Sequence, residues 1–149
     1  MSMFRIFDVA GSAVSAQSQR LNVVASNLAN ADTVAGPDGK AYKARQVVFQ
    51  TVMMGQASMQ GWQSAQAGSE LASAGVRVST ISENDAPGRR VRDPNHPAAD
   101  PEGYVTYSNV SAVEEMVNMI SASRSYQNNI EVMNTARTLL TKTLQMGQS

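Results

Sequence analysis

The feature that most constrains this chain is a long amphipathic stretch near its C-terminal end, from Ser111 to Met146. Apolar side chains recur there every three or four residues, the spacing that places them on one face of an α-helix. No proline or glycine interrupts the stretch before Gly147. At ~1.5 Å per residue the predicted helix is on the order of 50 Å long, more than a small domain needs to cover its core. The apolar stripe consists of Met116, Met119, Ala122, Tyr126, Ile130, Met133, Ala136, Leu140 and Leu144.

The start of this helix is marked by a capping pattern. Ser111 precedes Glu114 by three residues, the spacing at which a serine and a glutamate satisfy each other's free backbone N–H groups. Glu114 and Glu115 fall in the first turn, where the helix dipole favours negative charge. Adjacent helical residues point about 100° apart, so these two carboxylates are not expected to serve one acid–base site.

A second helix is predicted from Ser2 to about Ala31. Its apolar residues alternate in steps of three and four, and part of the series recurs every seven residues, the period of a coiled-coil seam. Gln17 is the one polar seam position, and Asn27, Asn30 and Asp32 favour a helix end. The series is Phe7, Ala10, Val14, Gln17, Leu21, Val24, Leu28 and Ala31.

The chain between these helices is rich in turn-forming residues. Residues 36–110 hold all five prolines and eight of the ten glycines. Tyr42–Gln50, Gly75–Ser82 and Gly103–Tyr107 are rich in β-branched and aromatic residues and are predicted as short strands. The stretch Met53–Ser73 is expected to be irregular, with Trp62 either packed locally or anchoring a partner.

These segments predict an α+β fold in three parts: an N-terminal helix (residues 1–35), a turn-rich middle with a small antiparallel β module (36–110) and a C-terminal helix (111–149). Both helices are too long merely to cover a small sheet. We expect them to pack on each other as a coiled-coil-like stalk from which the β module projects. A single helix is marginal in water, so we also expect the termini to be poorly ordered in the free monomer and to order on assembly.

Charge and composition exclude several functions. The net charge is zero and basic and acidic residues are balanced along the chain, which disfavours nucleic acid or an anionic membrane as a partner. The cluster Arg89, Arg90 and Arg92 is expected to be a solvated loop rather than a phosphate site. There are no cysteines, no cleavable signal is evident, and no apolar run approaches the ~18 residues of a membrane span.

Candidate catalytic and metal-binding residues are few. His96, the single histidine, lies in a predicted turn-rich loop, and a small hydrolase using His96 and Asp100 is the weakest interpretation. Asp93, Asp100 and Glu102 carry carboxylates but match no calcium-loop spacing. We therefore expect no catalytic site, cofactor, metal or small-molecule substrate.

One motif is recognisable. Residues 26–33, SNLANADT, resemble the signature that closes the N-terminal helix in the rod and hook proteins of the bacterial flagellum. Similarity to the proximal-rod members of that family extends to Phe7–Val14, Tyr42–Phe49, Asp93–Pro97, Gly103–Val105 and Val113–Tyr126. Hook-type relatives carry a Thr-x-Gly-Tyr turn after the signature, whereas here Ala41 stands in the glycine place. The motif residues are Asn27, Leu28, Ala29 and Asn30.

The resemblance implies a structural, non-enzymatic subunit of the proximal rod of the flagellar basal body. Such a subunit is exported unfolded through the flagellar type III apparatus without a cleaved signal, and assembles in the periplasm with copies of itself, other rod proteins and rotor-side proteins. It carries torque from rotor to hook through helices packed between subunits. The expected packing residues are Val14, Leu21, Val24, Leu28, Met119, Tyr126, Ile130, Met133 and Leu140.

The helical pattern alone leaves one alternative of another class. A cytosolic coiled-coil adaptor or export chaperone could use the methionine-bearing stripe to hold client helices, because methionine packs adaptably against varied surfaces. A rod subunit belongs with envelope basal bodies, whereas an adaptor remains in solution with its client.

Overall fold

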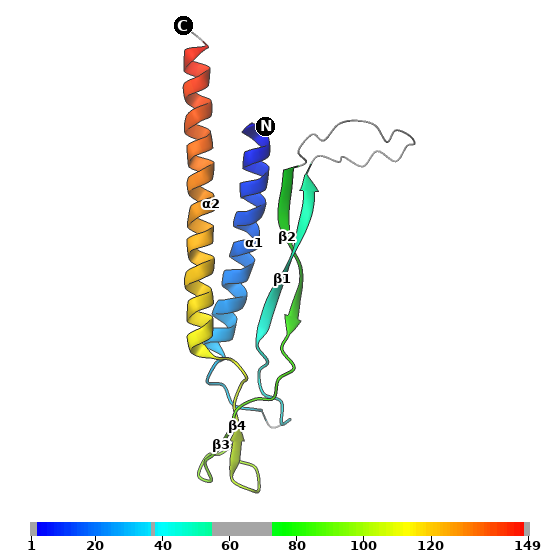
Figure 1. Cartoon of the computed structure of the whole chain (residues 1–149). Coiled ribbons are helices and arrows are strands. Elements are labelled where there is room, and N and C mark those ends of the chain that lie inside the picture. The colour runs from blue at the N-terminus through cyan, green and yellow to red at the C-terminus, as the bar shows by residue number, and fades with distance from the viewer. Residues whose placement is uncertain (1–2, 37, 55–72, 148–149) are drawn as a thin grey trace, which may run out of the picture.

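The structure is a computed structural model that describes residues 3–36, 38–54 and 73–147. Its elements in chain order are α1 (Met3–Ala29), β1 (Arg45–Met54), β2 (Ser73–Glu83), β3 (Arg90–Arg92), β4 (Tyr104–Thr106) and α2 (Ala112–Met146). The two helices lie side by side and antiparallel, and the β1–β2 hairpin runs along the other side of α1 (Figure 1). The predicted α+β class with paired terminal helices is confirmed.

Helix α2 begins where the capping pattern predicts. The Ser111 hydroxyl accepts a hydrogen bond from the Glu114 N–H at 3.4 Å, and Glu114 and Glu115 occupy the first turn. Helix α1 ends in a turn in which the Asn30 side chain donates to the Ser26 carbonyl at 2.8 Å. Local signals of this kind act over one helical turn, which is why the sequence predicts both ends closely.

The core between the elements is thin. Small side chains let the helix axes approach closely, but they bury little apolar area, so the single chain gains little hydrophobic stabilisation. Among the described residues, the buried apolar side chains are Ala10, Ala16, Val24, Ala31, Ala44, Val105, Ala122 and Ala136.

The β1–β2 hairpin is longer than predicted. Its strands pair antiparallel from Arg45 opposite Glu83 to Met54 opposite Ser73, with an irregularity between Val48 and Phe49. The predicted strand Tyr42–Gln50 therefore starts too early and ends too early. The ends of the stretch expected to be irregular, Met53–Ser73, are strand residues, and residues 55–72, including Trp62, lie outside the described part.

The prediction that the whole β module projects from the stalk is wrong. The β1–β2 hairpin lies against α1 (Figure 1), where the Val76 N–H donates to the Ser12 hydroxyl at 3.1 Å and Gly75 is buried. Only β3 and β4 project, beyond the lower end of the helix pair (Figure 1). The sequence shows how long each segment is but not which face of α1 a hairpin will cover.

The prediction that the arginine cluster lies in a loop is wrong for two of its three members, Arg90 and Arg92. Arg90–Arg92 form strand β3, which pairs antiparallel with β4 as a separate two-stranded ribbon. The arginine side chains are exposed, but Val91 stands opposite Val105, which is fully buried. One apolar pair is too short a pattern for a strand prediction. Neither helix, over the described residues, is long and apolar enough to cross a lipid bilayer.

Candidate assembly surface

A fully buried asparagine joins three segments at the lower end of the helix pair. Asn27 is 0% exposed. Its Oδ1 accepts hydrogen bonds from the Arg45 N–H at 2.9 Å and the Tyr42 hydroxyl at 3.0 Å. Its Nδ2 donates to the Arg45 carbonyl at 2.7 Å and to Glu115 Oε2 at 3.1 Å. Because the amide uses both donors and both acceptor positions, it ties the end of α1 to the start of β1 and the first turn of α2.

Asn27 and its hydrogen-bond partners Tyr42, Arg45 and Glu115 form a hub, of which Glu115 is the buried charged member, only 8% exposed. Its second oxygen accepts from Asn118 at 3.4 Å, and Asn118 in turn accepts from the Arg20 guanidinium at 3.2 Å. A buried carboxylate needs such partners because desolvation is costly. The sequence predicts Glu115 only as a first-turn carboxylate and Tyr42 only as a strand residue, since no spacing rule links residues so far apart in the chain.

A second asparagine fixes the projecting ribbon to the helix pair. Asn109 Oδ1 accepts from the Ala44 N–H at 2.7 Å, and its Nδ2 donates to the carbonyls of Asn84 and Ala86 at 2.9 and 2.8 Å. Nearby, the buried Ser108 hydroxyl donates to the Ala31 carbonyl at 2.7 Å. Four segments are therefore joined here by hydrogen bonds, so the ribbon and the helices are expected to move as one body.

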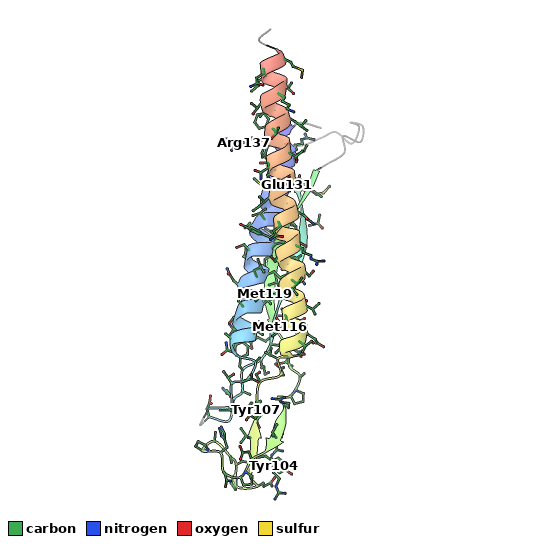
Figure 2. The ribbon with its side chains drawn as sticks, turned by 90° about the vertical axis from the view of Figure 1, so that its left-hand side faces the viewer. Tyr104, Tyr107, Met116, Met119, Glu131 and Arg137 are labelled. Atoms are coloured by element: carbon green, nitrogen blue, oxygen red, sulfur yellow. The ribbon has the colours of Figure 1, made fainter. Side chains whose placement is uncertain are left out.

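Gly88 shows how closely the chain packs at this junction. A Cβ atom placed on Gly88 would lie 2.1 Å from the Tyr107 carbonyl oxygen. Because that oxygen belongs to the backbone, no side chain can be accommodated without moving the ribbon. Arg89 and Arg90 lie over the rings of Tyr107 and Tyr104, with 5.2 and 4.9 Å from guanidinium carbon to ring centroid, and Figure 2 labels both tyrosines on the ribbon below the helices.

The predicted packing residues are mostly half-buried. Val24 is buried and Ile130 is 36% exposed. Of the motif residues, Asn27 is buried, Leu28 and Asn30 are half-buried and Ala29 is exposed. The flank of the stripe is therefore left partly open in the single chain. The half-buried packing residues are Val14, Leu21, Leu28, Met119, Tyr126, Met133 and Leu140.

The predicted α1 series is only partly buried. Its members Ala10, Val24 and Ala31 are buried, as is Ala16 outside the series, whereas Phe7 is half-buried. Helix α1 packs against the hairpin as well as against α2. Gln17, predicted as the polar seam position, has a buried side-chain oxygen for which no hydrogen-bond partner is found in the described part of the chain.

Among the described residues, large apolar side chains are exposed near both ends of α2, and others, including Val48, Ile81 and Val132, are exposed on the hairpin and in the middle of α2. The base patch comprises Val113, Met116, Val117 and Ile120, which are 72, 51, 62 and 56% exposed. The tip patch comprises Leu139 and Leu144 on α2, with Phe4 on α1. Met116 and Leu144 belong to the predicted stripe, but the structure leaves both uncovered. The base patch lies on one helical face, and contiguous exposed apolar patches of this kind mark interaction sites in soluble proteins.

Helix α2 is longer than α1, which leaves the end of its α1-facing side, at Leu144, uncovered. Helix α1 has 27 residues and α2 has 35, about 40 and 52 Å at ~1.5 Å per residue. Figure 1 shows α2 extending past the start of α1. In Figure 2, which looks from the side of α2, Met116 and Met119 lie on its lower turns and Glu131 and Arg137 on its upper turns.

The candidate catalytic residues are engaged in local turns. Asp100 accepts hydrogen bonds from the N–H groups of Tyr104 and Glu102 at 2.8 and 3.0 Å and from the Arg90 guanidinium at 2.8 Å. The Tyr104 N–H is the main cause of a lowered pKa for the Asp100 carboxyl, and Arg90 adds to it. His96 Nδ1 accepts from the Ala98 N–H at 3.1 Å. Over the described ranges, no three His, Asp or Glu side chains gather as metal ligands would.

Comparisons with known proteins agree with the motif. A family described as "Flagella basal body rod protein" matches residues 7–37, and "Flagellar basal body rod FlgEFG protein C-terminal" matches residues 102–146. The chain is 55% identical over 148 residues to the flagellar basal-body rod protein FlgC of Yersinia enterocolitica, and 51% identical over 148 residues to that of Escherichia coli O6:H1. Its identity to FlgC of Bacillus subtilis is 37% over 150 residues. Each comparison covers 99% of this chain and 100% of the relative.

Proposed function

Since this chain belongs to the family of the flagellar basal-body rod protein FlgC, we propose that this structural subunit of the flagellar rod occupies the proximal rod and carries torque from the rotor toward the hook. Its expected neighbours are copies of itself, other rod proteins and rotor-side basal-body proteins. The observation that carries the proposal is the pair of exposed apolar patches on a helix pair whose own core is thin.

The mechanism is mechanical. Torque passes between subunits as shear, and shear is resisted by many interdigitated side chains, because close-packed interfaces deform little. The half-buried flank of the stripe, with Leu21 and Leu28 on α1 and Tyr126 and Met133 on α2, supplies side chains that a neighbouring helix would cover. The Asn109 junction couples the projecting ribbon to the same helices, so a load on one part reaches the other.

We also propose that the chain is exported unfolded through the flagellar type III apparatus, without a cleaved signal. It then assembles in the periplasm. The thin core supports it, since a core made largely of alanines loses little apolar burial when the chain unfolds. The thin core also supports the expectation that the termini become fully ordered only when neighbouring subunits cover them. No cofactor or small-molecule substrate is required.

Cell fractionation tests the proposal against the adaptor alternative. An affinity-tagged copy should complement a deletion of its gene and should sediment with detergent-extracted basal bodies from the envelope. A hook protein is the matched positive control and a cytosolic export chaperone the negative one. Recovery of the tagged chain only in the soluble fraction, bound to a client, would overturn the rod assignment and favour the adaptor.

The hydrolase interpretation is tested by His96→Ala. The imidazole caps one exposed turn through a single accepted hydrogen bond, so its loss should change the free energy of unfolding by no more than about 0.5 kcal/mol. Swimming speed in soft agar should equal that of wild type. A non-motile His96→Ala strain with normal protein levels would revive a chemical role for this loop.

A further inference from the structure

The sequence signature at residues 26–33 lies where the chain turns from the helix pair toward the projecting ribbon. It begins inside α1 and continues past Ala29, where that helix ends at the lower end of the pair (Figure 1). The Asn30 side chain donates to the Ser26 carbonyl at 2.8 Å, and the Thr33 hydroxyl donates to the Asn30 carbonyl at 2.8 Å. These local hydrogen bonds end the helix and set the direction of the residues that follow.

Residues 33–35 lie along one edge of the chain that forms β4. The Ser108 N–H donates to the Thr33 carbonyl at 3.0 Å, and the Ala35 N–H donates to the Thr106 carbonyl at 2.8 Å. Both bonds join backbone to backbone, so they do not depend on the identity of the side chains. The end of the signature therefore attaches directly to the ribbon.

Tyr107 shows that β4 continues as the central segment of three. It forms an antiparallel bridge with Val34, and its N–H donates to the Arg89 carbonyl, next to β3, at 2.8 Å. Successive residues of a strand direct their N–H and C=O groups to opposite sides. The residues before and after Tyr107 therefore bond to residues 33–35, while Tyr107 itself bonds toward β3. Val105, in this central segment, is fully buried.

The ribbon is held by two separate attachments. The Ser108 side chain, only 3% exposed, donates its hydroxyl to the Ala31 carbonyl at 2.7 Å and so joins the ribbon to the end of α1. Asn109 instead bonds to the Ala44 N–H and the Asn84 carbonyl, which belong to the connections around the hairpin. Because buried polar groups are rarely left without partners, a pivot of the ribbon that separates Ser108 from Ala31 is opposed.

We propose that the signature is the joint that fixes the direction of the ribbon relative to the helix pair, through residues 33–35 paired with β4. This inference goes beyond the proposed function, because it assigns the motif a role within one chain. Asn30 and Thr33 act as positioning residues that direct residues 33–35 onto β4. Without this pairing, the ribbon would be held at the Asn109 junction alone and would pivot about it.

Distances between two spin labels in the purified full chain test the joint. The chain has no native cysteine, so labels at Arg92→Cys on β3 and Ser121→Cys on α2, both exposed positions, report the direction of the ribbon. We expect one narrow distance distribution. Ala35→Pro removes the N–H that bonds to Thr106 and should make the distribution about twice as broad. Ala35→Ser, which keeps the N–H, is the matched control and should leave it narrow.

An unchanged distribution in Ala35→Pro would mean that Asn109 alone fixes the ribbon, which overturns the inference. A distribution that is already broad without this change would also overturn it. If Ala35→Pro fails to fold by circular dichroism, Ser108→Ala, which removes the hydroxyl bonded to Ala31, should broaden the distribution in its place, and an unchanged width would count against the joint.

Hydrogen exchange provides a test that needs no variant. The amides of Ala35 and Ser108 should exchange slower than in an unfolded chain by on the order of tenfold or more, because both donate to the backbone of the facing segment. Unprotected amides at both positions would overturn the joint. These measurements use the isolated chain, so they are independent of swimming and of recovery in basal bodies, which report on the proposed function.

Discussion

Replacing Asn27 with aspartate should destabilise the lower end of the helix pair by about 3–5 kcal/mol at neutral pH, because it places an unpaired charge in a buried site. The change keeps the acceptor that faces Tyr42 and the Arg45 N–H. It replaces the Nδ2 donor with an oxygen 2.7 Å from the Arg45 carbonyl and 3.1 Å from the Glu115 carboxylate. Urea unfolding of the purified chain, followed by circular dichroism, measures the loss.

Two further measurements identify the cause. Lower pH should reduce the loss of stability in Asn27→Asp, since protonation of either the new aspartate or Glu115 restores a hydrogen-bond donor between the two carboxyl groups. Adding Glu115→Gln should recover part of the lost stability for the same reason, and a double-mutant cycle gives the coupling energy. Asn22→Asp is the matched control, because Asn22 is exposed on the same helix. Equal, small losses in the free energy of unfolding for Asn22→Asp and Asn27→Asp would contradict the stabilising role of the Asn27 hydrogen bonds.

The hub also shows where sequence reasoning stops. The motif singled out Asn27, but its partners Tyr42, Arg45 and Glu115 lie 15, 18 and 88 residues away. A hydrogen bond between distant segments leaves no periodic trace in the sequence. The Ser111 cap could be predicted because it joins residues only three positions apart. Both long helices could be predicted for a related reason, since their apolar spacing is local and is repeated over many turns.

The errors have a common physical origin. The predicted seam of α1 includes the buried Ala10 and Val24, but the helical spacing treated α1 as though it had one neighbour. The hairpin occupies a second side of α1, and Ala16, outside the predicted series, is also buried. The hairpin docks through the Val76 N–H and the Ser12 hydroxyl, a contact that hydrophobic patterning does not record. Of the two strands of the ribbon, β4 lies within the predicted strand Gly103–Tyr107. Strand β3 was missed because it contains three residues, fewer than a reliable alternation requires.

Replacing Ile130 with aspartate should abolish rod assembly and swimming while leaving export of the chain largely intact. Ile130 is 36% exposed on the flank of the stripe, so the single chain tolerates a charge there. Under the proposed function a neighbouring helix covers this flank. Losing an isoleucine contact worth ~1.5–3 kcal/mol, and burying an unpaired carboxylate in its place, then weakens every such contact in the rod.

The matched control is Asn128→Asp, which adds the same charge to the same helix about 200° around its axis, at an exposed position. We expect Asn128→Asp cells to swim, and Ile130→Asp cells to export the chain without incorporating it into basal bodies. Leu28→Asp, at a half-buried motif position on α1, should match Ile130→Asp, because each change disrupts the surface on which a neighbour packs. Normal swimming of both apolar-to-charged variants would mean that this flank faces solvent in the assembled rod, and that torque passes between subunits elsewhere.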